Sequence, residues 1–171
     1  MVPLRRWLAL VILLSLLGCG YRPMGAEPLS SQERPTLAIP PFGNRSTEVG
    51  LEAVLAKALV NAFSQSRAVR VTPSAQNADL VLEGKVQSLE NSSVAFNDVT
   101  RSSVRRVTIR VEIDLRRGSG GKTIWKETMT LQEDYVVDPN YQIGEAIKGE
   151  GIRRAAINLA RRVLDKVLLV I

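Results

Sequence analysis

The clearest hydrophobic pattern in the chain is a strict alternation of apolar and polar residues over 104–116. Val, Ile and Leu residues occupy the odd positions from 107 to 115, and Thr, Arg, Glu and Asp residues lie between them. A period of two is typical of a strand in a sheet with one buried face and one solvated face. The glycine-rich segment 118–121 predicts a turn, which makes 123–135 an antiparallel hairpin partner.

Two other segments repeat with the period of a helix. Over 50–65, apolar residues recur at four-residue steps and predict an amphipathic helix. The closing segment carries a similar stripe from Ile152 to Val167, which predicts a final helix from about Glu145 to Val167. Glycines at 149 and 151 weaken its first turns, so we expect it to start nearer Ile152.

Shorter apolar runs over 36–42, 69–72 and 79–89 predict three further strands. The first should end at Pro40 and Pro41 or lie at a sheet edge, because proline cannot donate to a ladder. The predicted order is therefore β-α-β-β-β-β-α. Both helices need an apolar surface, and the dry face of the sheet supplies one. The expected fold class is α+β, a two-layer sandwich.

The N-terminus has the pattern of an export signal. Arg5 and Arg6 precede an apolar run over 7–17, which is shorter than the roughly 20 residues of a membrane-spanning helix. The run ends in LLGC, which resembles a bacterial lipobox, and Cys19 is the only cysteine in the sequence. We expect residues 1–18 to be a cleaved signal, Cys19 to carry lipid, 19–35 to form a flexible tether, and 36–171 to form one domain. The alternative is a plain signal peptide with an incidental cysteine.

Composition narrows the function classes. The formal net charge is +6, from 23 basic and 17 acidic residues, and part of that excess leaves with the signal. This mild excess in an exported protein argues against nucleic acid and favours an anionic lipid or glycolipid. The sequence has no histidine, which excludes histidine-based catalytic units. With Cys19 acylated, no soft metal ligand is left, so we expect no cofactor beyond the covalent lipid.

Several blocks of the mature chain resemble the LptE family, the lipoproteins of lipopolysaccharide (LPS) assembly. They follow in order along nearly the whole mature chain, and the block IPPFxNxS followed by GLE is the most specific of them. The matching segments are Cys19-Gly20-Tyr21, LAIPPFGNRSTEVGLE at 37–52, ADLVLEGKV at 78–86, IWKE at 124–127, and the closing helix.

The resemblance implies a non-enzymatic protein that sits inside a large LptD-type outer-membrane β-barrel and helps pass LPS to the cell surface. It implies two helices on one face of a mainly antiparallel four-stranded sheet. Gly20, where inner-membrane retention would use aspartate, favours attachment to the periplasmic side of the outer membrane. The implied partners are the barrel, LPS and the membrane that holds the lipid.

Arginines could supply contacts to LPS. Four of them cluster on or before the alternating strand, at Arg101, Arg105, Arg106 and Arg110. The guanidinium fork matches phosphate geometry, so we hypothesise that they contact LPS or the barrel wall. The alternative is a solvated sheet face. A second arginine group in the final helix (Arg153, Arg154, Arg161, Arg162) and Phe96, in an expected loop over 92–100, are weaker candidates.

Two other functions stay open at this point. One is an auxiliary lipoprotein of a different envelope transporter or secretion complex, which could share the strand-then-helix layout. The other is an exported hydrolase that uses carboxylates alone, which predicts a cleft with paired Asp or Glu of raised pKa.

Overall fold

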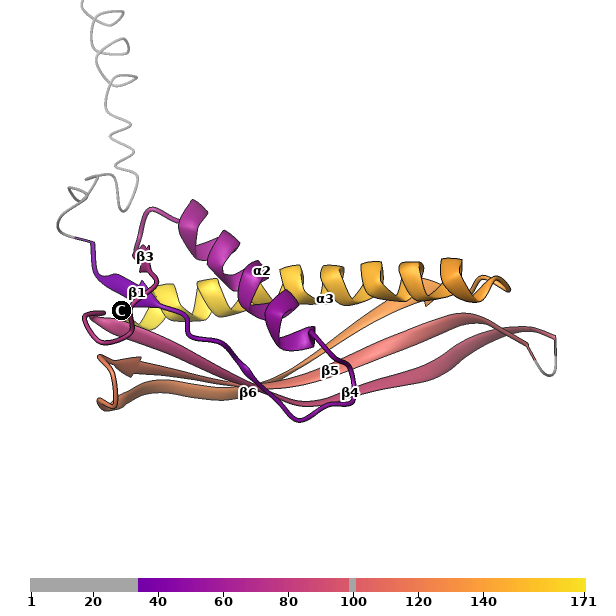
Figure 1. Ribbon diagram of the computed structural model, residues 1–171, viewed down its shortest axis with the longest axis horizontal. Helices are drawn as coiled ribbons and strands as arrows, with labels where there is room; N and C mark the ends of the chain where they lie inside the picture. The colour runs from indigo at the N-terminus through magenta and orange to yellow at the C-terminus, as the bar shows by residue number, and fades with distance from the viewer. Residues whose placement is uncertain (1–33, 99–100) are drawn as a thin grey trace, which may run out of the picture. The chain divides into compact units, whose positions relative to one another are not determined.

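The computed structural model describes residues 34–98 and 101–171 of the chain. Within these residues, the chain forms six strands and two helices (Figure 1). The order is β1 (Thr36–Ala38), β2 (Gly43–Asn44), α2 (Leu51–Gln65), β3 (Arg70–Thr72), β4 (Leu80–Asp98), β5 (Arg101–Arg117), β6 (Thr123–Val136) and α3 (Tyr141–Val170). The α+β class and the general order of elements are therefore as the hydrophobic pattern predicts.

The strands form one mixed sheet in the order β3-β1-β4-β5-β6, with β2 paired to β4 beside β1. β1 runs parallel to both β3 and β4, and β2 also runs parallel to β4. The expectation of a four-stranded, mainly antiparallel sheet is therefore only roughly right. The parallel part has a simple cause, because α2 carries the chain back over the sheet between β1 and β3, and such a crossover makes its two strands parallel.

The antiparallel part is a long meander of β4, β5 and β6. The predicted turn at 118–121 joins β5 to β6, and Gly118 and Gly120 adopt positive φ angles there. β4 extends to Asp98, so the loop expected over 92–100 is wrong for residues 92–98. Pairing with β5 extends this segment although its own sequence does not alternate, and register shifts between 86 and 98 absorb the irregularity.

The helices cover one face of the sheet (Figure 1). Helix α2 buries the predicted stripe Leu51, Leu55, Leu59 and Phe63. Helix α3 begins at Tyr141, well before the predicted start near Glu145 or Ile152. The side chain of Asn140 caps it by accepting hydrogen bonds from the N–H groups of Gln142 and Ile143.

The core lies between the two layers. The odd positions of β5 from 107 to 115 are fully buried against α2 and α3, as the alternation predicts. Phe42, from the segment before β2, is also buried there. Its ring lies against the backbone of Gly84 in β4, and a Cβ atom at position 84 would occupy the space of the ring. The two sequence blocks 37–52 and 78–86 therefore pack directly on each other.

Candidate functional site

The face of the sheet opposite the helices is polar. It presents the even positions of β5 from 106 to 116, together with their neighbours on β4 and β6. Ion pairs and hydrogen bonds cross it between strands. Lys126 lies 3.0 Å from the Glu112 carboxylate, and the Gln87 amide donates to the same carboxylate at 3.3 Å.

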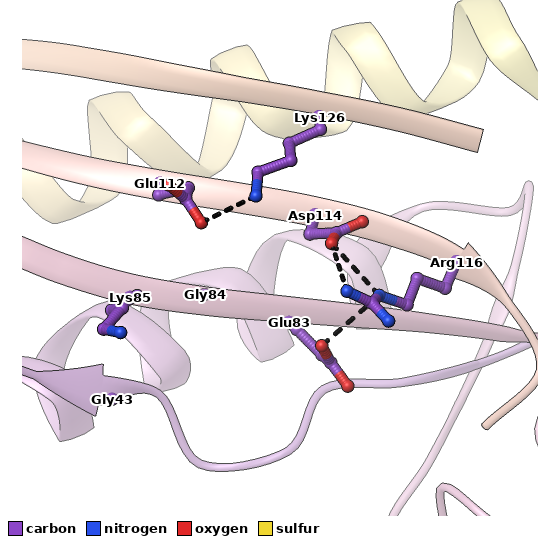
Figure 2. A pocket seen from close by; sticks show the side chains of 8 residues that line it. All are labelled: Gly43, Glu83, Gly84, Lys85, Glu112, Asp114, Arg116 and Lys126. Atoms are coloured by element: carbon purple, nitrogen blue, oxygen red, sulfur yellow. Dashed lines mark hydrogen bonds and ion pairs between the residues drawn. The ribbon is translucent and has the colours of Figure 1, made fainter. Parts of the chain in front are cut away.

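A shallow hollow of about 310 Å³ lies at one end of this face (Figure 2). Gly43, Glu83, Gly84, Lys85, Glu112, Asp114, Arg116 and Lys126 line it. Asp114 is its most buried charge, and it accepts hydrogen bonds from Arg116 Nε at 3.0 Å and from the Thr123 hydroxyl at 3.1 Å. These contacts raise the pKa of Arg116, first through the hydrogen bond to Asp114 and then through its charge. Within the described residues, the charged side chains of the hollow are therefore paired with one another, except for Lys85.

Two carboxyl groups have a clearly shifted pKa: Asp79, which accepts hydrogen bonds from Thr36, and Asp134, which accepts hydrogen bonds from Arg106. Both pKa values are lowered. A general acid needs a raised pKa, so neither of these two groups suits that role. In the described part of the chain, no group of three or more acidic, His or Cys side chains is placed to hold a metal ion.

The four candidate arginines of β5 do not form one cluster. Arg105 pairs with Tyr135 in register and shares the helix side of the sheet, whereas Arg106 and Arg110 lie on the polar side. Arg106 makes a two-pronged contact with Asp134, with Nε to Oδ1 at 2.6 Å and Nη2 to Oδ2 at 2.8 Å. Its hydrogen bonds to Asp134 raise the pKa of Arg106 and lower that of Asp134. Arg101 lies at the start of β5, and its side chain is outside the described residues.

Arg105 and Arg110 differ from Arg106 in having no ion pair within the described residues, and both are exposed. Because Arg105 is an odd and Arg110 an even position of the same strand, these two arginines lie on opposite sides of the sheet.

Exposed apolar side chains gather where β6 meets α3. Val136 pairs with Val104 in register and is 63% exposed, and Tyr141 and Ile143 follow in the first turn of α3. Phe96, near the end of β4, is 59% exposed but lies in a strand rather than a loop.

The two arginines near the middle of α3, Arg153 and Arg154, both contact other groups of the domain. Arg153 pairs with Glu150 one turn earlier. Arg154 donates to the backbone carbonyl of Asp134 at 3.1 Å and so covers part of the free edge of β6. Arg161 and Arg162 each line a shallow surface hollow, one beside α2 and the other beside β6.

Asn44, the last residue of β2, forms side-chain hydrogen bonds to the loop before α2 that the sequence pattern did not indicate. The Asn44 amide donates to the Glu48 carbonyl at 2.8 Å and to the Glu52 carboxylate at 2.7 Å. Its oxygen accepts from both the N–H and the hydroxyl of Ser46, each at 2.8 Å. The Asn-x-Ser spacing after IPPF was the available signal, since this pair forms a local side-chain turn.

The same loop is tied to α3. Lys148 donates to the Glu48 carboxylate at 2.8 Å and lies close to Glu145. Burial opposes the charge of Lys148, but the hydrogen bonds and charges of the two glutamates outweigh it and raise the pKa of the amine. Val49, the next residue of this loop, is 97% exposed.

One sequence prediction concerns the chain's attachment to a membrane. Cys19, the predicted lipid attachment site, lies outside the described residues. Within the described ranges, neither helix has the length and apolarity needed to cross a membrane.

Three solved structures share this fold at low sequence identity. A putative lipoprotein from Caulobacter crescentus is 18% identical, with a TM-score of 0.54, over 75% of this chain and 86% of its own. The rare lipoprotein B from Shewanella oneidensis is 17% identical, with a TM-score of 0.52, over 78% and 93%. A protein from Xanthomonas campestris is 15% identical, with a TM-score of 0.59, over 86% and 90%.

No curated protein sequence matches the chain significantly. The family model described as lipopolysaccharide-assembly, LptE, matches residues 34–167, which include every strand and nearly all of α3. This family is one of non-enzymatic lipoproteins of the bacterial envelope. The chain belongs to the LptE family of lipopolysaccharide-assembly lipoproteins.

Proposed function

We propose that this protein is an outer-membrane lipoprotein, anchored on the periplasmic side through Cys19, that binds and supports an LptD-type β-barrel. In that position it assists the assembly of LPS and its transport to the cell surface. The family match over residues 34–167 carries the proposal. The N-terminal LLGC sequence with Gly20 supports the anchor and its membrane.

The surface of the domain suits a protein and glycolipid partner better than a small substrate. Exposed apolar residues at the junction of β6 and α3 (Val136, Tyr141, Ile143) could pack against a barrel wall. Arg105 and Arg110 are free to bind phosphate groups of LPS, whereas Arg106 is already neutralised by Asp134.

Co-purification tests the protein partner. The acylated protein, extracted in mild detergent, should retain a large outer-membrane β-barrel. Tyr141→Asp should reduce that retention, because it places a charge in an exposed apolar surface, while Ala53→Asp at an exposed position of α2 should not. Retention of an ABC transporter in place of a barrel would instead identify an auxiliary lipoprotein of another envelope system.

LPS binding is tested with matched arginine variants of one strand. We expect Arg105→Gln or Arg110→Gln to weaken LPS binding at low salt by roughly tenfold, given about 1.5–3 kcal/mol for a hydrogen bond to a charged group. Arg106→Gln should have a smaller effect, because its guanidinium already contacts Asp134. The variant that loses affinity identifies the side of the sheet that meets LPS. Unchanged affinity in all three variants would contradict a role for this strand in LPS binding.

A further inference from the structure

The last turn of α3 exposes a run of large apolar side chains. Leu168, Leu169, Val170 and Ile171 are 41%, 81%, 40% and 48% exposed. The core stripe of the same helix is fully covered at Val163 and Val167. Leu168 and Leu169 lie off that stripe, whereas Val170 continues its spacing but is still partly exposed. We call these four residues the apolar end.

The apolar end lies beside the first described residues of the domain. Val170 and Ile171 line a hollow of about 330 Å³ together with Pro35, Leu80 and Ile124. Figure 1 shows the end of α3 next to β1 and on the same side as the turn between β5 and β6. Start and end of the described domain thus share one surface.

Two basic residues flank this surface. Arg117 lines the same hollow, and Lys122 accepts a hydrogen bond from the Arg117 N–H through its backbone carbonyl. Both side chains are exposed, and neither has an ion pair within the described residues. The nearby carboxylate of Asp79 is occupied by the N–H and hydroxyl of Thr36, at 2.8 and 2.7 Å. Exposed apolar residues with free cations beside them match the interface of an anionic bilayer.

The length of the segment between Cys19 and the domain limits how far a lipid on Cys19 can lie from this surface. Residues 20–33 connect Cys19 to the domain. Fully extended, a linker of this length reaches at most about 50 Å. Lipid held at Cys19 therefore keeps a bilayer surface within that reach of Pro35, at a high effective concentration for the apolar end.

We propose that the apolar end, with Arg117 and Lys122, is a membrane-contacting surface that docks on the anionic bilayer in which the Cys19 lipid is inserted. The proposal rests on the proposed lipid anchor and adds to it a defined orientation of the domain. The apolar side chains enter the headgroup region, and the two cations contact lipid phosphates.

Two labelled variants of the acylated protein test this orientation. Leu169→Cys and Tyr141→Cys place a thiol at opposite ends of α3, and the native side chains are 81% and 78% exposed. Acylation blocks Cys19, so the new thiol is the one that reacts with an environment-sensitive dye such as NBD. Each protein is reconstituted in phosphatidylglycerol-containing vesicles with a spin-labelled quencher lipid, after mass spectrometry has confirmed the acyl groups.

We expect the label at 169 to be shifted to the blue and to lose most of its fluorescence to the quencher, and the label at 141 to do neither. Arg117→Glu with Lys122→Glu should reduce quenching at 169 in these vesicles but not in purely zwitterionic ones. Equal quenching at both positions, or none at 169, would overturn the docking surface. So would a blue shift at 169 that requires added β-barrel protein and shows no lipid quenching.

Failure of this proposal can be told apart from failure of the proposed function. If the protein carries no acyl groups on Cys19, the proposed membrane anchor and the proposed docking are both wrong. If the protein is acylated and still retains its barrel but shows no quenching at position 169, only the proposed docking is wrong.

Discussion

The contact between Phe42 and Gly84 makes a sharp prediction about stability. A Cβ at position 84 would overlap three atoms of the Phe42 ring, and the ring is 5% exposed in the core. Ordinary carbon contacts lie at about 3.5–4.0 Å, so Gly84→Ala forces the ring to retreat from the core. Overpacking of this kind costs about 1–3 kcal/mol. The conformational gain of replacing glycine in a strand offsets roughly 0.5–1 kcal/mol of that cost.

We therefore expect Gly84→Ala to destabilise the domain by about 1–2 kcal/mol, which lowers Tm by roughly 3–10 °C for a chain of this size. Gly149→Ala is the matched control, because its Cβ position in α3 has no atom within 4 Å apart from its chain neighbours and the helix's own backbone. This control should instead stabilise by about 0.5–1 kcal/mol. Urea unfolding followed by circular dichroism measures both variants.

A double-mutant cycle that combines Gly84→Ala with Phe42→Leu tests the cause. The smaller side chain at position 42 alone should destabilise the domain, but it should also relieve the overlap with the methyl group introduced at position 84. The two changes together should therefore cost less than their sum by about 1 kcal/mol. Additive costs, or a Gly84→Ala protein as stable as the wild type, would refute the packing argument.

Three further outcomes follow from named contacts. Asn44→Ala removes four hydrogen bonds and should destabilise the domain by about 1–3 kcal/mol, with faster hydrogen exchange in the loop before α2. Arg154→Ala uncovers the Asp134 carbonyl at the edge of β6, so sedimentation should show more self-association while Tm changes little. Thr36→Val removes a donor that lowers the pKa of Asp79. That contribution is present above pH about 3.8 and lost as pH falls through the lowered pKa, so the stability gap between wild type and variant should narrow in acid unfolding measurements. The part of the gap that remains reflects the lost hydrogen bond from the Asp79 N–H to the Thr36 hydroxyl, which does not depend on this titration.

Strand β5 could be predicted because the alternation within its own sequence is sufficient, without knowledge of the neighbouring strands. The burial of the odd positions and the placement of the even ones on the opposite, polar face follow from the period alone. The start of α3 was not predictable in this way. Gly149 and Gly151 lower helix propensity, but a Cβ placed on Gly151 would lie 3.7 Å from Tyr135, and tertiary contact of this kind overrides propensity.

The state of the arginines could not be predicted for a related reason. Arg106 and Asp134 are 28 positions apart in sequence, and the register of β5 against β6 brings them together. Arg105 and Arg110 carry the same side chain on the same strand, yet they have no such neighbour within the described ranges. A cluster of like charges in sequence therefore says little about which member is free, because strand alternation and cross-strand pairing decide that.

The short strand β1 has a mechanical consequence. Thr36, Leu37 and Ala38 are held by strands on both sides, with β3 in the register Thr36 to Arg70 and with β4 in the register Leu37 to Leu80. Tension along the chain from an anchored N-terminus would load these hydrogen bonds together in shear rather than peel them one at a time. Hydrogen bonds between Thr36 and Asp79 strengthen the start of β1, where such a force would first act. A force on the anchor would therefore have to break all of these hydrogen bonds together before it could pull Leu37 out of the core.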